Sequence, residues 1–223
     1  MTKKMYRTWL AVLILFMVGA CEQKPVVEPS GKTIKIGVIA PFSGSDVAKG
    51  KEGLNGVRAV MQMHPLLNNG DRVEIVTKDD RNDPKRSVMA LHELAEKEKV
   101  SAVLTLSGSG PVLSMARVAD RYKVPILAGL ATHPEVTQKS DYVSQVCFDN
   151  IFQGKVAALF VRDELLLDRV AVFLTPRSYY SHNLATEFIQ KFTALHGEIT
   201  DKILLKDQNV DMLALVQSVR DKN

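Results

Sequence analysis

A short run of glycines and hydroxyl residues, Ser107-Gly108-Ser109-Gly110-Pro111, is the segment of this sequence best suited to bind or attack a small molecule. It lies between an apolar stretch typical of a buried strand and an amphipathic stretch typical of a helix. Glycines at such a junction let another molecule approach the backbone closely. Three kinds of chemistry fit these residue types: phosphate binding, attack by a serine nucleophile, and capture of a carboxylate.

Phosphate binding is poorly supported, because the run lacks residues that phosphate-binding loops require. A Walker A loop needs Gly-Lys-Ser/Thr, whereas Pro111 follows Gly110 and no lysine occurs before Lys123. A dinucleotide-binding fingerprint needs a third glycine for close packing of helix and strand, and Leu113 occupies that position. Both nucleotide interpretations are therefore disfavoured.

A hydrolase site has little more support. A nucleophile elbow places the serine between two glycines in Gly-x-Ser-x-Gly, and neither of these glycines is present around Ser109. His133 and His182 could act as bases, but nothing in the sequence orients them. Helix capping and solvation explain the acidic residues at 79–83, and the histidines lack zinc-ligand spacing. We therefore predict no enzymatic activity and no metal or other cofactor, with an esterase acting through Ser109 as a minor alternative.

Capture of a carboxylate fits the run best. A helix that begins at Pro111 would direct its free N–H groups toward the preceding residues, and its N-terminus would carry about half a positive charge. The hydroxyls of Ser107 and Ser109 would add donors, and hydrogen bonds to a charged group contribute about 1.5–3 kcal/mol each. The alternative is a serine N-cap with flexible glycines and no ligand. The run thus favours binding without identifying what is bound.

The elements that must position this run alternate between strand and helix. Such alternation predicts parallel strands joined by right-handed crossovers, and hence a doubly wound α/β fold. An aspartate before a proline, Asp83-Pro84, is a typical helix start. Strands are predicted at residues 33–40, 72–80, 100–106 and 124–131, and helices at 51–67, 84–99 and 111–123.

The alternation pauses near residues 142–150 and then resumes, which indicates a second α/β unit that begins near Asn150. This unit has only two predicted strands, so we expect an incomplete second lobe in a C-terminally truncated chain. In the second unit, helices are predicted at 152–166, 182–197 and 211–222, and strands at 169–174 and 198–205.

The N-terminus has the pattern of an export signal. Three cations precede an apolar core at residues 10–18, which is shorter than the roughly 20 residues needed to cross a bilayer. Val18-Gly19-Ala20-Cys21 resembles a bacterial lipobox, in which the cysteine is lipidated and becomes the mature N-terminus. We predict a lipoprotein signal peptide at 1–20 and a lipid tether at 21–31. An ordinary signal peptide is the alternative.

The signal peptide also changes the charge of the mature protein. Of the 29 lysines and arginines, three lie in the signal, which leaves 26 against 25 acidic residues and a net charge of about +1. Such a balance is not the footprint of a nucleic-acid-binding protein. With Cys21 lipidated, Cys147 is left without an intrachain partner and is expected to be a packing residue.

Five segments resemble, in order along the chain, the branched-chain amino-acid-binding group of type I periplasmic solute-binding proteins. The similarity runs from Ile34 to the C-terminus and implies two doubly wound α/β lobes that close on a ligand, at residues 32–148 and 149–223. The five segments are "IKIGVIAPFSG…GLNGVRAV", "VTKDDRNDPKRSV", "SGSGPVLSMARVADRYKVPIL", "LATHPEVTQKSDYV" and "RVAVFLTPRSYYSHNLATEF".

The resemblance implies a set of ligand-binding residues in the first lobe. In relatives, a serine at the start of the third helix holds the ligand carboxylate. Ser109 takes that place, with Ser107 as the alternative one turn away. A backbone group and a threonine side chain in the "-AT-P" loop complete the first-lobe contacts, and here they are Leu130 (or Ala131) and Thr132.

From the second lobe, relatives contribute a tyrosine just after a strand, and Tyr180, next to Tyr179, matches it. The resemblance implies a lipid-anchored substrate-binding component of an ABC importer in the periplasm or cell envelope. It would capture an amino acid or a related carboxylate or amide and deliver it to a permease in the inner membrane. The alternative is an envelope lipoprotein that binds a protein partner, as a cell-wall synthesis activator or a sensor input.

Three features depart from the family pattern. Lys49 stands where relatives often place an aromatic side chain over the ligand, which leaves room for a polar or acidic ligand group. Asn82 and Leu106 stand at or near the positions of a disulfide that some relatives have. The acidic residue that binds the ligand ammonium in relatives would lie beyond Asn223. We therefore expect weak or no binding by this chain alone.

Overall fold

The structure of the protein is a computed structural model that describes residues 28–205 and 210–221. The predicted signal peptide and the predicted lipidation site at Cys21 lie outside these residues. Within the described ranges, no helix is long and apolar enough to cross a membrane.

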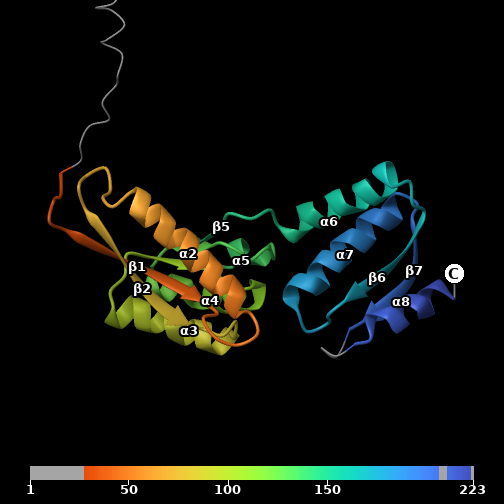
Figure 1. The fold of residues 1–223 in the computed structure, drawn as a ribbon, viewed down its shortest axis with the longest axis horizontal. Coiled ribbons are helices and arrows are strands. Elements are labelled where there is room, and N and C mark those ends of the chain that lie inside the picture. The colour runs from red at the N-terminus through yellow and green to blue at the C-terminus, as the bar shows by residue number, and fades with distance from the viewer. Residues whose placement is uncertain (1–27, 206–209, 222–223) are drawn as a thin grey trace, which may run out of the picture.

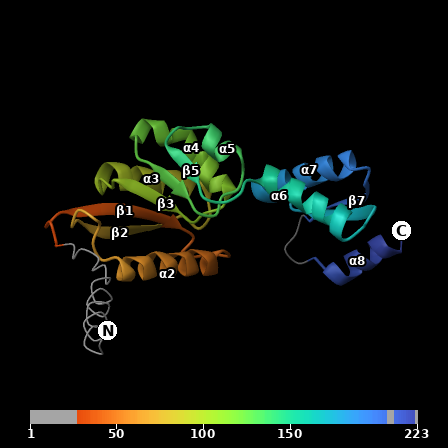
Figure 2. The ribbon, with the colours of Figure 1, turned by 90° about the horizontal axis from the view of Figure 1, so that it is seen from above.

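A five-stranded parallel sheet forms the first α/β unit, with the strand order β2-β1-β3-β4-β5. Figure 2 shows α2 on one face of this sheet and α3 and α4 on the other. The strand β5 lies in the segment where the alternating pattern pauses. It was not predicted from the sequence, because three residues are too few to show a period. The strands are β1 (Thr33–Ala40), β2 (Arg72–Asp79), β3 (Ala102–Thr105), β4 (Ile126–Ala128) and β5 (Val143–Gln145). The helices are α2 (Val47–Met63), α3 (Pro84–His92) with the π-helical turn η1 (Glu93–Lys97), α4 (Ser109–Tyr122) and α5 (Glu135–Gln138).

The second α/β unit contains two parallel strands and lies beside the first, joined to it by the segment after β5 (Figure 1). The predicted lobe boundary at residues 148 and 149 falls between β5 and α6. The α/β class expected from the alternating pattern is confirmed. The elements of this unit are α6 (Asn150–Leu159), the π-helical turn η2 (Phe160–Glu164), β6 (Arg169–Leu174), α7 (Tyr179–Ala194), β7 (Glu198–Leu204) and α8 (Met212–Arg220).

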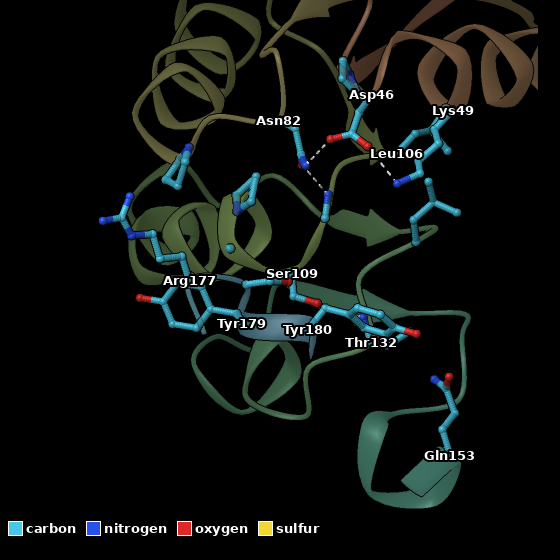
Figure 3. Close-up of a pocket in the computed structure, with 17 residues that line it drawn as sticks. Asp46, Lys49, Asn82, Leu106, Ser109, Thr132, Gln153, Arg177, Tyr179 and Tyr180 are labelled. Atoms are coloured by element: carbon cyan, nitrogen blue, oxygen red, sulfur yellow. Dashed lines mark hydrogen bonds and ion pairs between the residues drawn. The ribbon is translucent and has the colours of Figure 1, made fainter. Parts of the chain in front are cut away.

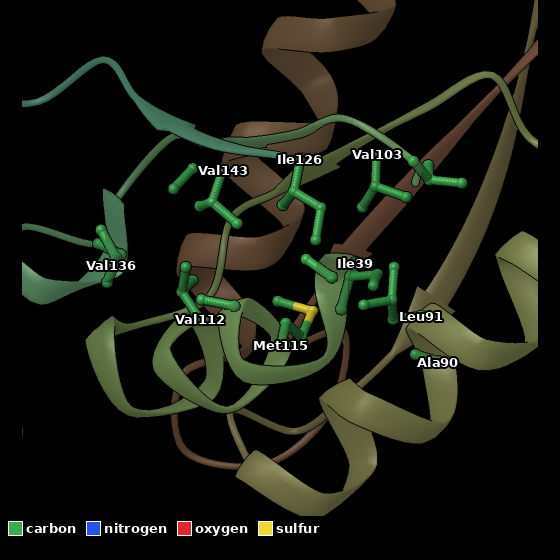
Figure 4. Close-up of a cluster of buried hydrophobic side chains, with 14 of the residues drawn as sticks. Ile39, Ala90, Leu91, Val103, Val112, Met115, Ile126, Val136 and Val143 are labelled. Atoms are coloured by element: carbon green, nitrogen blue, oxygen red, sulfur yellow. The ribbon is translucent and has the colours of Figure 1, made fainter. Parts of the chain in front are cut away.

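The larger cluster of buried apolar side chains lies between the first sheet and the helices α3 and α4 (Figure 4). Ile39 from β1 packs there with Leu91 from α3 and Met115 from α4, and all three are fully buried. The capping prediction for α3 is confirmed: the Asp83 carboxylate accepts a hydrogen bond of 2.9 Å from the N–H of Arg86. This packing orients α4, and therefore its N-terminus, against the sheet.

The start of α4 differs from the sequence prediction. The helix begins at Ser109, with Gly108 as its N-cap, and not at Pro111. Pro111 is tolerated as the third helical residue because the first four N–H groups of a helix have no intrahelical partner. As a consequence, Ser109 and Gly110 belong to the first turn, and their own N–H groups form the helix N-terminus.

Gly50, in α2, lets the helix approach the loop that follows β1. A Cβ atom at this position would lie 2.3 Å from the carbonyl oxygen of Pro41. Replacing Gly50 with alanine should therefore lower the free energy of unfolding by about 1–3 kcal/mol, despite the higher helix propensity of alanine. Urea denaturation followed by circular dichroism measures this loss.

Gly56 is a matched control in the same helix, because a Cβ atom there would meet no other atom within 4 Å. Replacing Gly56 with alanine should leave stability unchanged or raise it by up to about 1 kcal/mol. Equal effects of the two substitutions would refute the steric explanation.

Candidate functional site

The loops that carry the predicted site residues meet at one edge of the first sheet. The strand register pairs Ala40 with Asp79 and Thr105 with Ala128, so the carboxyl ends of the parallel strands lie together. Ligands of open α/β sheets bind beyond this edge. The run around Ser109 and the loop that contains Thr132 therefore share the expected place for a site.

A cavity of about 680 Å³ lies between this edge and the start of α7 (Figure 3). Residues of both α/β units line it. Ser107 and Ala131, by contrast, are fully buried and are not part of the lining. The predicted site residues that line the cavity are Ser109, Leu130, Thr132 and Tyr180.

Thr132 is held through its backbone, and its hydroxyl is left without a partner. The Ser109 hydroxyl oxygen accepts hydrogen bonds from the N–H of Thr132 at 3.2 Å and of His133 at 3.3 Å. The carbonyl of Thr132 accepts a hydrogen bond of 2.8 Å from the N–H of Asn150. Thr132 is 8% exposed, yet its Oγ1 has no partner among the described residues. An unsatisfied buried hydroxyl costs about 1–3 kcal/mol, so this atom is a candidate ligand contact.

The N-terminus of α4 adds further donors beside the Thr132 hydroxyl. The N–H groups of Ser109 and Gly110 have no partner in the described part of the chain, whereas the N–H of Gly108 donates to Asn82 Oδ1 at 2.8 Å. The Ser109 hydroxyl, which accepts two hydrogen bonds, still has its own hydrogen to donate. Together these groups form a donor set at the positive end of a helix, which suits a carboxylate.

Ser107 has a different environment from the one expected for a ligand contact. Its hydroxyl donates a hydrogen bond of 2.6 Å to Asp80 Oδ2, which also accepts one of 2.6 Å from the Ser87 hydroxyl. Helix capping and solvation were expected to explain the acidic residues at 79–83. For Asp80 this expectation was wrong, because its carboxylate is fully buried and bound by hydroxyls. The Ser107 hydroxyl fixes the loop in front of α4 and does not line the cavity.

An ion pair lies on the first-unit side of the cavity. Lys49 Nζ is 2.7 Å from Asp46 Oδ1, and Asn82 Nδ2 donates to Asp46 Oδ2 at 2.9 Å. The hydrogen bond from Lys49 lowers the pKa of Asp46, and desolvation opposes it in part. Asp46 is therefore a carboxylate that is already paired, and Lys49 occupies the position where an aromatic side chain was expected from relatives.

Tyr179 joins the two units at the other end of the cavity. Its ring meets that of His133 edge-on, with 6.2 Å between the centroids. Burial lowers the pKa of His133, while the charge of Glu135 acts in the opposite direction. A Cβ atom on Gly110 would lie 3.2 Å from the Tyr179 ring, so the absence of a side chain there lets the ring approach α4.

Several lining residues were not predicted from the sequence. Asn82, Gln153 and Arg177 line the cavity, and Asn150 links the two units through Thr132 and through a hydrogen bond of 3.4 Å to the carbonyl of Tyr180. Asn82 has a φ of 57°, a conformation that asparagine tolerates better than most residues.

The described residues contain no cluster of His, Cys, Asp and Glu that could hold a metal ion.

Parallel α/β units that face each other across a lined cavity define a two-lobed binding fold. The chain belongs to the periplasmic binding protein family, whose model matches residues 33–223. The family assignment made from the five sequence segments is therefore confirmed.

Sequence and structural similarity to individual proteins supports this assignment. The Leu/Ile/Val-binding protein homolog 6 of Brucella abortus is 26% identical over 191 residues, which make up 84% of this chain and 48% of that protein. The crystal structure of the leucine binding protein LivK from Thermotoga maritima has a TM-score of 0.76 and 33% identity, over 84% of this chain and 54% of that one. The crystal structure of a solute binding protein from Rhodopseudomonas palustris in complex with p-hydroxybenzoic acid has a TM-score of 0.78 and 26% identity, over 86% of this chain and 52% of that one. The chain thus spans about half the length of these relatives.

Proposed function

We propose that the protein is the extracytoplasmic substrate-binding component of an ABC importer and captures an amino acid or related carboxylate between its two lobes. The observation that carries this proposal is the unpartnered hydroxyl of Thr132, which lies beside the free N–H groups at the start of α4. Membership of the periplasmic binding protein family supports it. The relatives include a leucine binding protein and a protein in complex with p-hydroxybenzoic acid, and both of these small molecules carry a carboxylate.

In the proposed mechanism, the ligand carboxylate accepts hydrogen bonds from the first unit. The donors are the N–H groups of Ser109 and Gly110 and the hydroxyls of Ser109 and Thr132. Tyr180 then covers the ligand from the second unit when the lobes close. The closed form would be recognised by a permease in the inner membrane. Attachment to the membrane through lipid on Cys21 remains a prediction from the sequence.

A comparison of carboxylates with their neutral amides tests this proposal. The complete protein as its gene encodes it, without the predicted signal peptide, would be titrated calorimetrically with a panel of amino acids and aromatic carboxylates. We expect at least one carboxylate to bind, and its amide to bind about tenfold more weakly or worse, because the amide loses the charge-assisted hydrogen bonds.

Isoleucine with isoleucinamide and p-hydroxybenzoic acid with p-hydroxybenzamide are suitable pairs for the panel. Binding of amides as tight as that of acids would refute carboxylate capture at this site. If no small carboxylate bound at all, the alternative of an envelope lipoprotein with a protein partner would replace the transport proposal.

A further inference from the structure

Three charged side chains of the described residues line the cavity, and only two of them are paired with each other. Asp46 and Lys49 form an ion pair at 2.7 Å, and Asn82 satisfies the second oxygen of Asp46. Arg177 lines the same cavity but has no hydrogen bond or ion pair with a described residue. One positive charge of the lining is therefore uncompensated.

The position of Arg177 strengthens the positive field on the second-unit side. Arg177 immediately precedes Ser178, the N-cap of the 16-residue helix α7, whose hydroxyl oxygen accepts a hydrogen bond of 3.2 Å from the N–H of Ser181. The positive end of this helix borders the cavity, because Tyr179 and Tyr180 in its first turn both line it. In Figure 3, Arg177 lies on the Tyr179 side of Ser109, while Thr132 lies on the opposite side.

A ligand with a single carboxylate would satisfy the donors near Ser109 and Thr132 and leave Arg177 unpaired. Closure of the lobes would then remove a cation from water without a counter-charge, which is unfavourable. A second carboxylate would instead pair with the guanidinium, which can bind it through two parallel hydrogen bonds. Asp46 cannot serve this purpose, since it is already bound to Lys49 and Asn82.

We propose that the ligand is a dicarboxylate, bound by one carboxylate at Ser109 and Thr132 and by the other at Arg177. This inference rests on the proposed function of the cavity as a carboxylate-capture site. It adds the ligand class and names Arg177 as the residue that determines it.

Matched pairs of dicarboxylates and their monoamides test the proposal on the complete protein. The pairs are L-aspartate with L-asparagine, L-glutamate with L-glutamine, and glutarate with glutaramate. In at least one pair the dicarboxylate should bind about tenfold more tightly or better, since a charge-assisted pair replaces a neutral contact. This preference should shrink as the salt concentration rises.

Variants of Arg177 separate its role from a general effect of charge. Arg177→Gln should weaken dicarboxylate binding by about tenfold or more and change monoamide binding by less than about twofold. Arg177→Lys should retain part of the preference. Arg58→Gln, which removes an exposed arginine of α2 outside the cavity lining, is the matched control and should leave both affinities unchanged.

The outcomes distinguish this inference from the proposed function. If monocarboxylates bind but no dicarboxylate is preferred, or if Arg177→Gln keeps the preference, the second acidic group is refuted and carboxylate capture stands. If no carboxylate binds, including isoleucine and p-hydroxybenzoic acid, both proposals fail. Thermal unfolding of each variant verifies that the substitution at this exposed position leaves the fold intact.

Discussion

Replacing Thr132 with valine is expected to weaken binding of a carboxylate ligand by about tenfold or more without lowering the stability of the ligand-free protein. The Oγ1 atom of Thr132 is buried and has no partner among the described residues, so valine removes no hydrogen bond from the ligand-free fold. In the complex, the variant would lose one hydrogen bond to a charged group, worth about 1.5–3 kcal/mol. Calorimetric titration measures the affinity, and thermal denaturation measures the stability.

Two further substitutions make this result specific. Thr132→Ser retains the hydroxyl and should retain most of the affinity. Thr137→Val changes the same residue type at an exposed position in α5, outside the cavity lining, and should not affect binding. The interpretation of Thr132 as a ligand contact would be abandoned if its valine variant bound the ligand as tightly as the unchanged protein.

The second large effect is expected on folding. Replacing Asp80 with alanine should lower the free energy of unfolding by about 3–6 kcal/mol. The substitution removes the hydrogen bonds that this buried carboxylate accepts from the hydroxyls of Ser87 and Ser107 and from the N–H of Asn82, and hydrogen bonds to a charged group contribute about 1.5–3 kcal/mol each. The Ser107 hydroxyl would be left without an acceptor inside the unit, whereas the Ser87 hydroxyl could still donate to the carbonyl of Asp83, 2.8 Å away, so the net loss is about two hydrogen bonds. Such a loss is comparable with the whole stability of many domains. Urea denaturation followed by circular dichroism would measure it.

Asp141 offers a control for the loss of one negative charge. It is exposed, and its replacement with alanine should change the stability by less than about 0.5 kcal/mol. Asp80→Asn, which retains an acceptor oxygen, should have an effect between those of the two alanine variants. A change below about 1 kcal/mol for Asp80→Ala would contradict a structural role for this carboxylate.

These two predictions assign different roles to hydroxyls in the two loops at the carboxyl-end edge of the first sheet. Ser107 belongs to the Asp80 cluster, so its loss should act on stability, whereas Thr132 should act on binding. Ser109 stands between them, because its oxygen accepts two backbone N–H groups and its hydrogen faces no protein acceptor among the described residues. Ser109→Ala is therefore a less clean test of binding than Thr132→Val.

The sequence alone determined the fold class, most of the elements and the family. Alternating apolar and amphipathic stretches report burial on a strand or helix, and burial follows a period that is local in the chain. The capping of α3 by Asp83 was also predictable, since the cap and the N–H that it binds are three residues apart. The five family segments also indicated Ser109, Thr132 and Tyr180 as candidate ligand contacts.

Only the tertiary structure decided what each candidate touches. The partners of Ser107 and Ser109 are 27 and 23 residues away along the chain, and strand order and register bring them together. Asp80 was expected in solvent and is buried for the same reason. Arg177 and Thr132 come from different units, so no local pattern could place them in one cavity. Periodicity encodes which side of an element is buried, whereas the hydrogen-bond partner of a buried group depends on how the elements are assembled.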